Sequence, residues 1–211
     1  MTKTLRRALL LSAGAAVLAT AALPAAAYCL TGVRWPSTSD VRYNPNGKVT
    51  SGQCISASQM DSAVTGGITP WSAIRYAGTT GAKANSRDGA NTVGWAKLGG
   101  GTLGVTNYLS YSRTYSCQKQ GVRFADLFEA DVRISTTYRW YSGGSCPCTA
   151  GSAFNLNSVS THEFGHVIGL CHTNTPSSLM YPSFDVCQTK NKGSDENAGE
   201  GFIYSGTCSP L

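Results

Sequence analysis

Alternating polar and apolar residues predict short strands along much of the chain. The clearest case is residues 129–135, where Glu-Ala-Asp-Val-Arg-Ile-Ser alternates and predicts a half-buried strand. Stretches rich in β-branched and aromatic residues predict four more strands. These lie at residues 41–43, 74–76, 92–95 and 102–106. Turn residues such as Pro45-Asn46-Gly47 separate them, so the pattern predicts a sheet of short strands.

Three other stretches carry helical patterns. They lie at residues 56–64, about 157–169, and 194–204. The predicted N-caps are Ser56 or Ser58 for the first helix and Ser194 or Asp195 for the last. The first helix can resume through Trp71, and the apolar side of the middle helix, with Phe164, Val167 and Ile168, is predicted to be buried. Neither a repeat nor a second composition interrupts these elements, so we expect one domain.

The middle helix carries the strongest motif in the chain. Residues 162–172 read His-Glu-Phe-Gly-His-Val-Ile-Gly-Leu-Cys-His, which is the spacing H-E-x-x-H-x-x-G-x-x-H. All three histidines of the chain, His162, His166 and His172, lie inside it. A chance match to five specified positions has odds on the order of one in ten thousand in a chain of this length. The spacing predicts a zinc site, and the alternative is three histidines without a metal.

The spacing explains how these side chains meet. His162 and His166 are four residues apart, so they are neighbours on one helix face and can share a metal ion. Glu163 is rotated by about 100° from His162 and stays beside the metal without binding it. Gly169 is a natural helix end because glycine accepts the left-handed cap conformation, and His172 then returns as a third ligand. Three protein ligands leave the fourth zinc position open, which is the catalytic arrangement.

In that arrangement Glu163 is the predicted general base. Zinc held by three neutral imidazoles lowers the pKa of its water to about 7 and polarises the scissile carbonyl of a peptide. Glu163 would take the proton from this water and pass it to the leaving amine. The motif therefore predicts peptide-bond hydrolysis.

Residues 1–27 have the features of an export signal. Basic residues (Lys3, Arg6, Arg7), an apolar run (8–23) and a cleavage site (Ala25-Ala26-Ala27) follow one another. Cleavage after Ala27 would leave a single catalytic domain over residues 28–211, so we expect a secreted, extracellular protein. The apolar run is short for a membrane anchor, and both the general secretory and the twin-arginine routes are compatible with the sequence.

Charge and hydropathy argue against two kinds of partner. Removal of residues 1–27 takes away three cations and no anions, which lowers the formal net charge from +6 to +3. This charge is weak and evenly spread, so no nucleic-acid partner is expected. No other stretch is apolar over the length of a membrane span, so no membrane partner is expected either.

Eight cysteines follow residue 27. They are Cys29, Cys54, Cys117, Cys146, Cys148, Cys171, Cys187 and Cys208. An even number in an exported chain predicts a disulfide framework. The alternative is a zinc site built on Cys146 and Cys148, although paired C-x-x-C spacings are missing. Cys171 and Cys187 flank the segment after the third histidine, and we expect these two to pair.

A glycine run precedes the strand predicted at residues 102–106. Gly99-Gly100-Gly101 is not a phosphate loop, because no Lys-Ser or Lys-Thr pair follows it in register. Within the strand, Gly104 would allow another backbone to come close. A peptide substrate can add to such an edge as an extra strand, and a plain glycine-rich turn is the alternative.

Further motifs follow the histidine stretch, and together they resemble the metzincin clan of zinc endopeptidases, within it the matrixin-like group. Residues 178–182, Ser-Leu-Met-Tyr-Pro, resemble the family's Met-turn, in which Met180 would form an apolar floor below the metal. Pro182-Ser183-Phe184 resembles the segment lining the primed-side specificity pocket, with Phe184 in place of tyrosine. Gly101-Thr102-Leu103 resembles the start of the substrate-binding edge strand, so the substrate-binding residues would be Leu103, Gly104, Val105, Pro182 and Phe184.

The resemblance covers roughly residues 43–204 and implies both a fold and an activity. The implied fold is an α+β metzincin fold, with a twisted, mostly parallel five-stranded sheet that has an antiparallel edge strand. Two long helices and a C-terminal helix accompany the sheet, and zinc lies in an active-site cleft. The implied activity is that of a secreted zinc metalloendopeptidase with one catalytic Zn²⁺, acting on peptides or proteins. We expect a monomer.

Several departures separate the chain from the family pattern. No histidine remains for a structural zinc site, and no cysteine-switch propeptide is expected before residue 28. Pro182 replaces the tyrosine ligand that some metzincins place two residues after the methionine, and Ca²⁺ is possible but has no clear ligand run. The alternatives are a non-catalytic zinc-binding recognition module on the same fold, and a zinc amidase acting on cell-wall peptides. Glu163 argues against the first alternative, because a structural site needs no base there.

Overall fold

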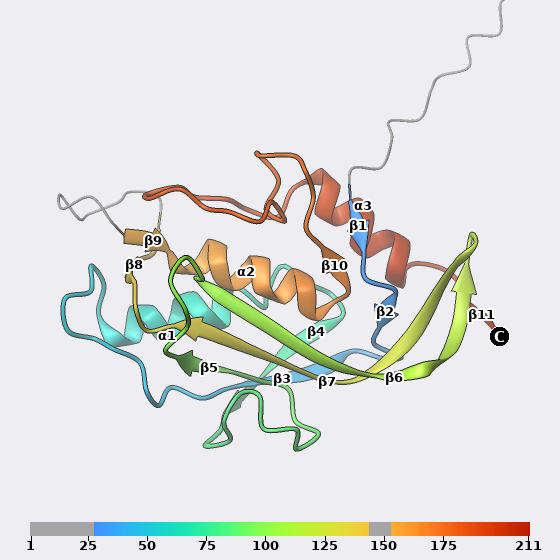
Figure 1. The fold of residues 1–211 in the computed structure, drawn as a ribbon, viewed down its shortest axis with the longest axis horizontal. Helices are drawn as coiled ribbons and strands as arrows, with labels where there is room; N and C mark the ends of the chain where they lie inside the picture. Colours follow the sequence, from blue (N-terminus) through green and yellow to red (C-terminus); the bar gives the residue numbers. More distant parts are fainter. Residues whose placement is uncertain (1–27, 144–152) are drawn as a thin grey trace, which may run out of the picture.

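The computed structural model describes residues 28–143 and 153–211 (Figure 1). The predicted export signal and the cysteines Cys146 and Cys148 lie outside these residues. Within them, no helix has the length and the apolar composition that crossing a membrane requires.

One sheet of seven strands forms the centre of the molecule. Its strands are β2 (Val33–Arg34), β3 (Ser39–Tyr43), β4 (Ile74–Thr79), β5 (Thr92–Ala96), β6 (Gly104–Lys119), β7 (Val122–Ser135) and β11 (Ser209–Pro210). Their order is β11-β6-β7-β5-β3-β4, and β2 also pairs with β7. The pairs among β2, β3, β4, β5 and β7 are parallel, whereas β6 is antiparallel to β7 and β11. The prediction of five strands was wrong in number, because the two-residue strands β2 and β11 join the sheet.

Two smaller sheets flank the main one. β1 (Cys29–Leu30) pairs antiparallel with β10 (Leu170–Cys171), and β8 (Arg139–Tyr141) pairs parallel with β9 (Ala153–Asn155). The first of these small sheets joins the start of the described chain to the strand directly before His172. This pairing therefore helps to fix the position of His172.

Each strand predicted from the sequence overlaps an observed one, but β6 and β7 are much longer than predicted. They form a long hairpin, visible as the curled pair of strands in Figure 1. The hairpin turns at Gln120 (φ 47°) and Gly121 (φ 83°), and two successive left-handed residues are what a tight two-residue hairpin turn requires. The hairpin extends the sheet well beyond the helix that carries the histidine motif (Figure 1).

The three predicted helices are present, with small differences at their ends. They are α1 (Ala57–Gly66), α2 (Leu156–Val167) and α3 (Ser194–Tyr204). Ser56 caps α1 and forms a capping box with Gln59, as one of the two predicted caps. Turns and not a helix follow α1 as far as Trp71. The caps predicted for α3 were wrong, because Gly193 is the N-cap and its N–H donates to Glu196 in the first turn.

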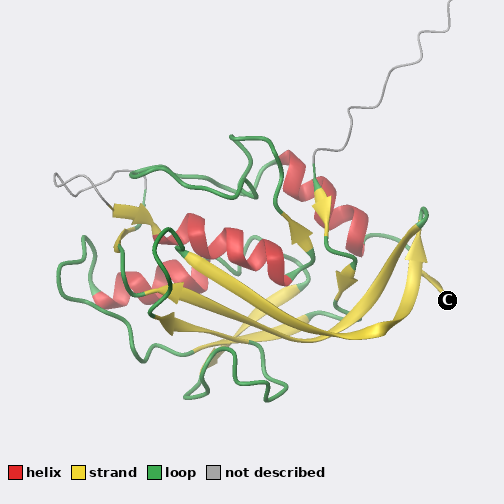
Figure 2. Ribbon diagram, viewed as in Figure 1, coloured by secondary structure: helices red, strands yellow, loops and turns green. Residues whose placement is uncertain are grey.

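Helices and loops take opposite faces of the main sheet. α1 and α2 lie together on one face, while the loop of residues 80–91 lies against the other (Figures 1 and 2). The predicted apolar side of α2 is confirmed, since Phe164, Val167 and Ile168 are at most 1% exposed. Almost every other residue of α2 is buried as well. The histidine motif therefore begins inside the core, and its geometry is fixed from several sides.

The disulfide predicted between Cys171 and Cys187 was wrong. Cys171 pairs with Cys29, because the antiparallel register of β1 and β10 puts these two residues directly opposite each other. Cys187 is disulfide-bonded as well, although not to Cys171. Its backbone lies beside β9, because its N–H donates to Ala153 O. A second described disulfide joins Cys117 of β6 to Cys208. Among the described residues, no cysteine is free.

Candidate active site

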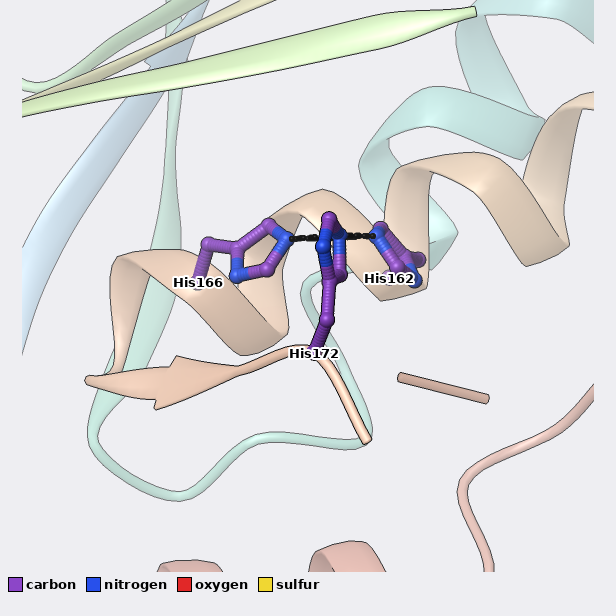
Figure 3. A group of neighbouring side chains, drawn as sticks. All are labelled: His162, His166 and His172. Atoms are coloured by element: carbon purple, nitrogen blue, oxygen red, sulfur yellow. Dashed lines mark hydrogen bonds between the residues drawn. The ribbon is translucent and has the colours of Figure 1, made fainter. Parts of the chain in front are cut away.

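The side chains of the three histidines converge on one point (Figure 3). His162 and His166 project from successive turns of α2, and His172 faces them from the segment after β10. Their Nε2 atoms lie 3.1–3.2 Å from one another. The chain reaches His172 through Gly169, whose φ of 99° ends the helix as predicted.

Hydrogen bonds fix which nitrogen faces this point in two of the three rings. His162 Nδ1 lies 2.7 Å from Leu179 O, and His166 Nδ1 lies 2.8 Å from Leu170 O. Since a carbonyl only accepts, both Nδ1 atoms carry the proton and both Nε2 atoms present a lone pair. Burial lowers the pKa of His162 to about 3 and that of His166 to about 4, so both rings are neutral at pH 7.

This arrangement fits a zinc ion. Tetrahedral zinc with Zn–N bonds of 2.0–2.1 Å places its nitrogen ligands about 3.4 Å apart, close to the separations observed here. Lone pairs that point at one another over this distance repel unless a cation lies between them. The three residues can therefore hold a metal ion, with neutral imidazoles as the donors.

Glu163 lies beside the histidines, held by the edge strand β6. Thr106 Oγ1 is 2.7 Å from Glu163 Oε2 and donates to it. Gly104 of the same strand makes room for the carboxylate, because a Cβ there would come within 2.6 Å of Oε1. The glycine was predicted to admit another backbone, and it admits this carboxylate instead. Burial raises the pKa of Glu163 to about 7, and the Thr106 hydrogen bond opposes the shift.

Met180 is packed against α2 at Gly165. A Cβ at Gly165 would overlap the Met180 sulfur, so glycine is required at this position for the methionine side chain to fit. The turn that carries Met180 is tied to α3 through Glu196, which accepts hydrogen bonds from Ser178 Oγ and Met180 N. Burial raises the pKa of Glu196, but these hydrogen bonds outweigh it and lower the pKa overall. Because Leu179 O of the same turn lies 2.7 Å from His162 Nδ1, Glu196 also helps to orient the His162 ring.

A cavity of about 320 Å³ opens beside these residues. Its lining includes His162, Glu163, His172, Leu103, Gly104, Pro182 and Phe184. Four of the five predicted substrate-binding residues therefore lie in one cavity with the candidate catalytic residues, whereas Val105 does not line it. The Phe184 ring stands edge-on to the His162 ring, with 5.5 Å between centroids.

Sequence reasoning missed several residues of this site. Thr106 holds Glu163, and Tyr138 and Phe154 line the cavity with their rings 5.4 Å apart. None of them belongs to a short motif, and only the folded chain brings Thr106 to Glu163 and the two rings to the cavity. The one available signal was that Thr106 lies two residues after Gly104 in a predicted strand, on the same face.

Comparisons with known proteins identify the family of this chain. The model of one family, described as Matrixin, matches residues 50–202. Matrix metalloproteinase-20 of Homo sapiens is 39% identical over 54 residues, which are 26% of this chain and 10% of that protein. Neutrophil collagenase of Homo sapiens is 37% identical over 60 residues, 28% of this chain and 13% of that protein. Matrix metalloproteinase-9 of Canis lupus familiaris is 29% identical over 114 residues, 52% of this chain and 15% of that protein.

The relatives are much longer than the region that they share with this chain. The matched stretches span 10–15% of their length, so the similarity concerns one part of each. The family match, in contrast, covers well over half of the chain and includes the histidine motif, the methionine turn and most of the sheet. The chain belongs to the matrixin family.

Proposed function

We propose that this protein is a secreted zinc-dependent endopeptidase with His162, His166 and His172 as zinc ligands. The observation that carries the proposal is the convergence of three Nε2 atoms at a spacing that suits zinc, beside a carboxylate in the same cavity. When bound there, zinc supplies Lewis-acid chemistry that polarises a carbonyl and activates water. Met180 acts as the apolar floor below this site.

Glu163 is the proposed general base. Its carboxylate faces the cavity, and the hydrogen bond from Thr106 Oγ1 leaves Oε1 for a proton from the attacking water. Burial raises its pKa to about 7, near the pH at which a base both accepts and returns a proton efficiently. Glu163 would then deliver that proton to the leaving amine.

The substrate is proposed to bind along β6 as an added strand. β11 pairs with β6 only near residues 117 and 118, so among the described strands nothing covers the outer edge of residues 104–110. Leu103, Gly104 and Val105 would contact the peptide along this edge. The outward-facing backbone of Gly104 would hydrogen-bond it, because Leu103 O faces β7 and accepts from Ser135 N. Pro182 and Phe184 would contact it from the other side, and the ring-lined cavity favours an apolar substrate side chain.

The expected export signal completes the proposal. Cleavage after Ala27 would release residues 28–211 as a single catalytic domain that works as a monomer outside the cell. The disulfides support this, because such bonds persist in oxidising surroundings. Peptides or proteins are the proposed substrates.

Incubation of the purified protein with casein tests the proposal. We expect cleavage that stops with 1,10-phenanthroline and returns with zinc, and about one zinc per chain by elemental analysis. Glu163→Ala should keep the zinc and lose cleavage. Bound zinc without hydrolysis of casein would favour the recognition module, and hydrolysis of cell-wall peptides alone would favour the amidase. Cleavage by Glu163→Ala at the parent's rate would refute the proposed base.

A further inference from the structure

The wall of the cavity at residues 182–184 belongs to no helix or strand, yet it places a ring against His162, a proposed zinc ligand. Phe184 stands edge-on to His162, while Pro182 and Ser183 are exposed. Among the described residues, one hydrogen bond reaches the backbone of residues 182–184, and it is made by a lysine. That lysine is Lys190, whose Nζ is 3.2 Å from Ser183 O.

Lys190 is almost fully enclosed. It is 6% exposed, and its ammonium lies 4.8 Å from the centre of the Tyr181 ring and 5.0 Å from that of Phe184. No carboxylate among the described residues forms an ion pair with it. Two aromatic faces and one carbonyl therefore take the place of water around this cation.

The backbone of Lys190 is fixed to the active-site helix. Ser158 Oγ accepts from Lys190 N at 2.9 Å and donates to Lys190 O at 2.7 Å. Ser158 is 1% exposed and lies one helical turn before His162 on the same face of α2. Lys190 thus connects the helix that carries two ligands to the cavity wall that carries Phe184.

We propose that Lys190 is a positioning residue that determines substrate selectivity, by holding the Phe184 wall at a fixed distance from α2. The proposal rests on the proposed endopeptidase function. A large apolar side chain that enters the cavity packs against the fixed ring, whereas a small one does not reach it. Loss of the cation frees the wall, and binding of the large side chain must then order it again.

The test compares two peptides that differ only in the residue after the scissile bond, phenylalanine in one and alanine in the other. In Lys190→Met, the ratio of their kcat/KM values should fall about tenfold, mainly through KM of the phenylalanine peptide. The alanine peptide should be cleaved within about twofold of the parent's rate, and zinc content should not change. Lys190→Arg keeps a cation that can stack on both rings, and it should retain the selectivity within about threefold.

Lys192→Met is the matched control. Lys192 also lies over a ring, 4.6 Å from the centre of the Trp71 ring, and pairs with Glu200. Its ammonium also donates to Pro70 O, so its contacts lie away from Ser183 and Phe184. Its loss should lower stability and leave the selectivity ratio unchanged. Tyr181→Leu removes one of the two rings around Lys190 and should lower the selectivity ratio about threefold. This variant is the second test of the proposal if Lys190→Met does not fold.

The outcomes separate this inference from the function on which it rests. A parent that cleaves neither peptide refutes the endopeptidase and the role of Lys190 with it. An active parent whose selectivity survives in Lys190→Met and in Tyr181→Leu refutes only the role of Lys190. An equal loss of selectivity in Lys192→Met would show that general destabilisation is the cause, and it would refute the inference as well.

Discussion

At the scale of single residues, burial of the Glu163 carboxylate should be measurable as a cost in stability. Its pKa is about 7 in the folded protein, against about 4.5 in the unfolded chain. Above pH 4.5 the unfolded state loses its proton while the folded state retains it, so stability falls as pH rises from 4.5 through 7. The loss amounts to about 3 kcal/mol once both states are ionised.

Glu163→Gln should therefore stabilise the zinc-free protein at pH 8 but not at pH 4.5. We expect a gain in unfolding free energy of about 1–3 kcal/mol at the higher pH, because glutamine can still accept from Thr106 and carries no charge. Urea unfolding of parent and variant at both pH values measures the difference. Equal differences at pH 4.5 and pH 8 would contradict the raised pKa.

Gly104→Ala tests the space that this carboxylate occupies. The new Cβ would come within 2.6 Å of Glu163 Oε1 and must displace it, so kcat should fall at least about tenfold while zinc remains bound. Gly94→Ala on β5 is the control, because its Cβ would meet its neighbours at 3.7 Å, an ordinary contact. Zinc content and casein cleavage of both variants decide the matter. A fully active Gly104→Ala would show that the carboxylate has another position.

How much of the site the sequence predicts depends on how local each constraint is. His162, Glu163 and His166 share one helix, so their spacing alone reveals their arrangement. Thr106 meets Glu163 across 57 residues of chain and carries no signature of its own. Lys190 reads as an ordinary surface cation until its two aromatic neighbours are placed around it.

At the scale of elements, the end of α2 depends on partners from elsewhere in the chain. The carbonyls of its last residues have no intrahelical donor. Trp35 Nε1 donates to Val167 O, Tyr204 OH donates to Ile168 O, and Thr31 N donates to Gly169 O. This end of the helix leads directly to His172, so these contacts also help to position a proposed zinc ligand.

Tyr204→Phe should weaken this arrangement. The Tyr204 hydroxyl donates to Ile168 O at 2.9 Å and accepts from Trp35 N at 3.2 Å. Phenylalanine has no hydroxyl, so Ile168 O and Trp35 N both lose this hydrogen bond. We expect a loss of about 1–3 kcal/mol in unfolding free energy, measured by urea denaturation. Tyr28→Phe, whose hydroxyl has no hydrogen bond to the described residues, should change it by less than about 0.5 kcal/mol. Equal effects of the two variants would contradict this account.

The sequence predicted the elements better than their lengths. Ser56 and Gly169 mark helix ends by their own conformational preferences, and both were found where they were expected. The hairpin of β6 and β7 was underestimated, because its residues alternate weakly and gain their partner only after the chain turns at Gln120 and Gly121. Long-range pairing therefore decided what local pattern did not.

At the scale of the whole molecule, the two disulfides whose pairs lie in the described part of the chain fasten the sheets at different places. Cys29–Cys171 joins the start of the described chain to the strand before His172, across a separation of 142 residues. Cys117–Cys208 joins the β6 hairpin to the C-terminal strand across 91 residues. Neither pairing follows from spacing, since each depends on a strand pair between distant segments. Both bonds join segments that are far apart in the chain, but only Cys29–Cys171 ends next to a proposed zinc ligand, His172.

That difference makes a matched experiment possible. The double variant Cys29→Ser with Cys171→Ser should lose about 2–4 kcal/mol of stability and also about 10–100-fold in zinc affinity, because the third ligand is no longer fastened. The double variant Cys117→Ser with Cys208→Ser should lose similar stability and retain its zinc affinity. Competition with a chelator below the melting temperature of both variants measures the affinity separately from unfolding. An equal loss of zinc in both variants would mean that the disulfides act only through global stability, whereas loss in the first alone assigns Cys29–Cys171 to the positioning of His172.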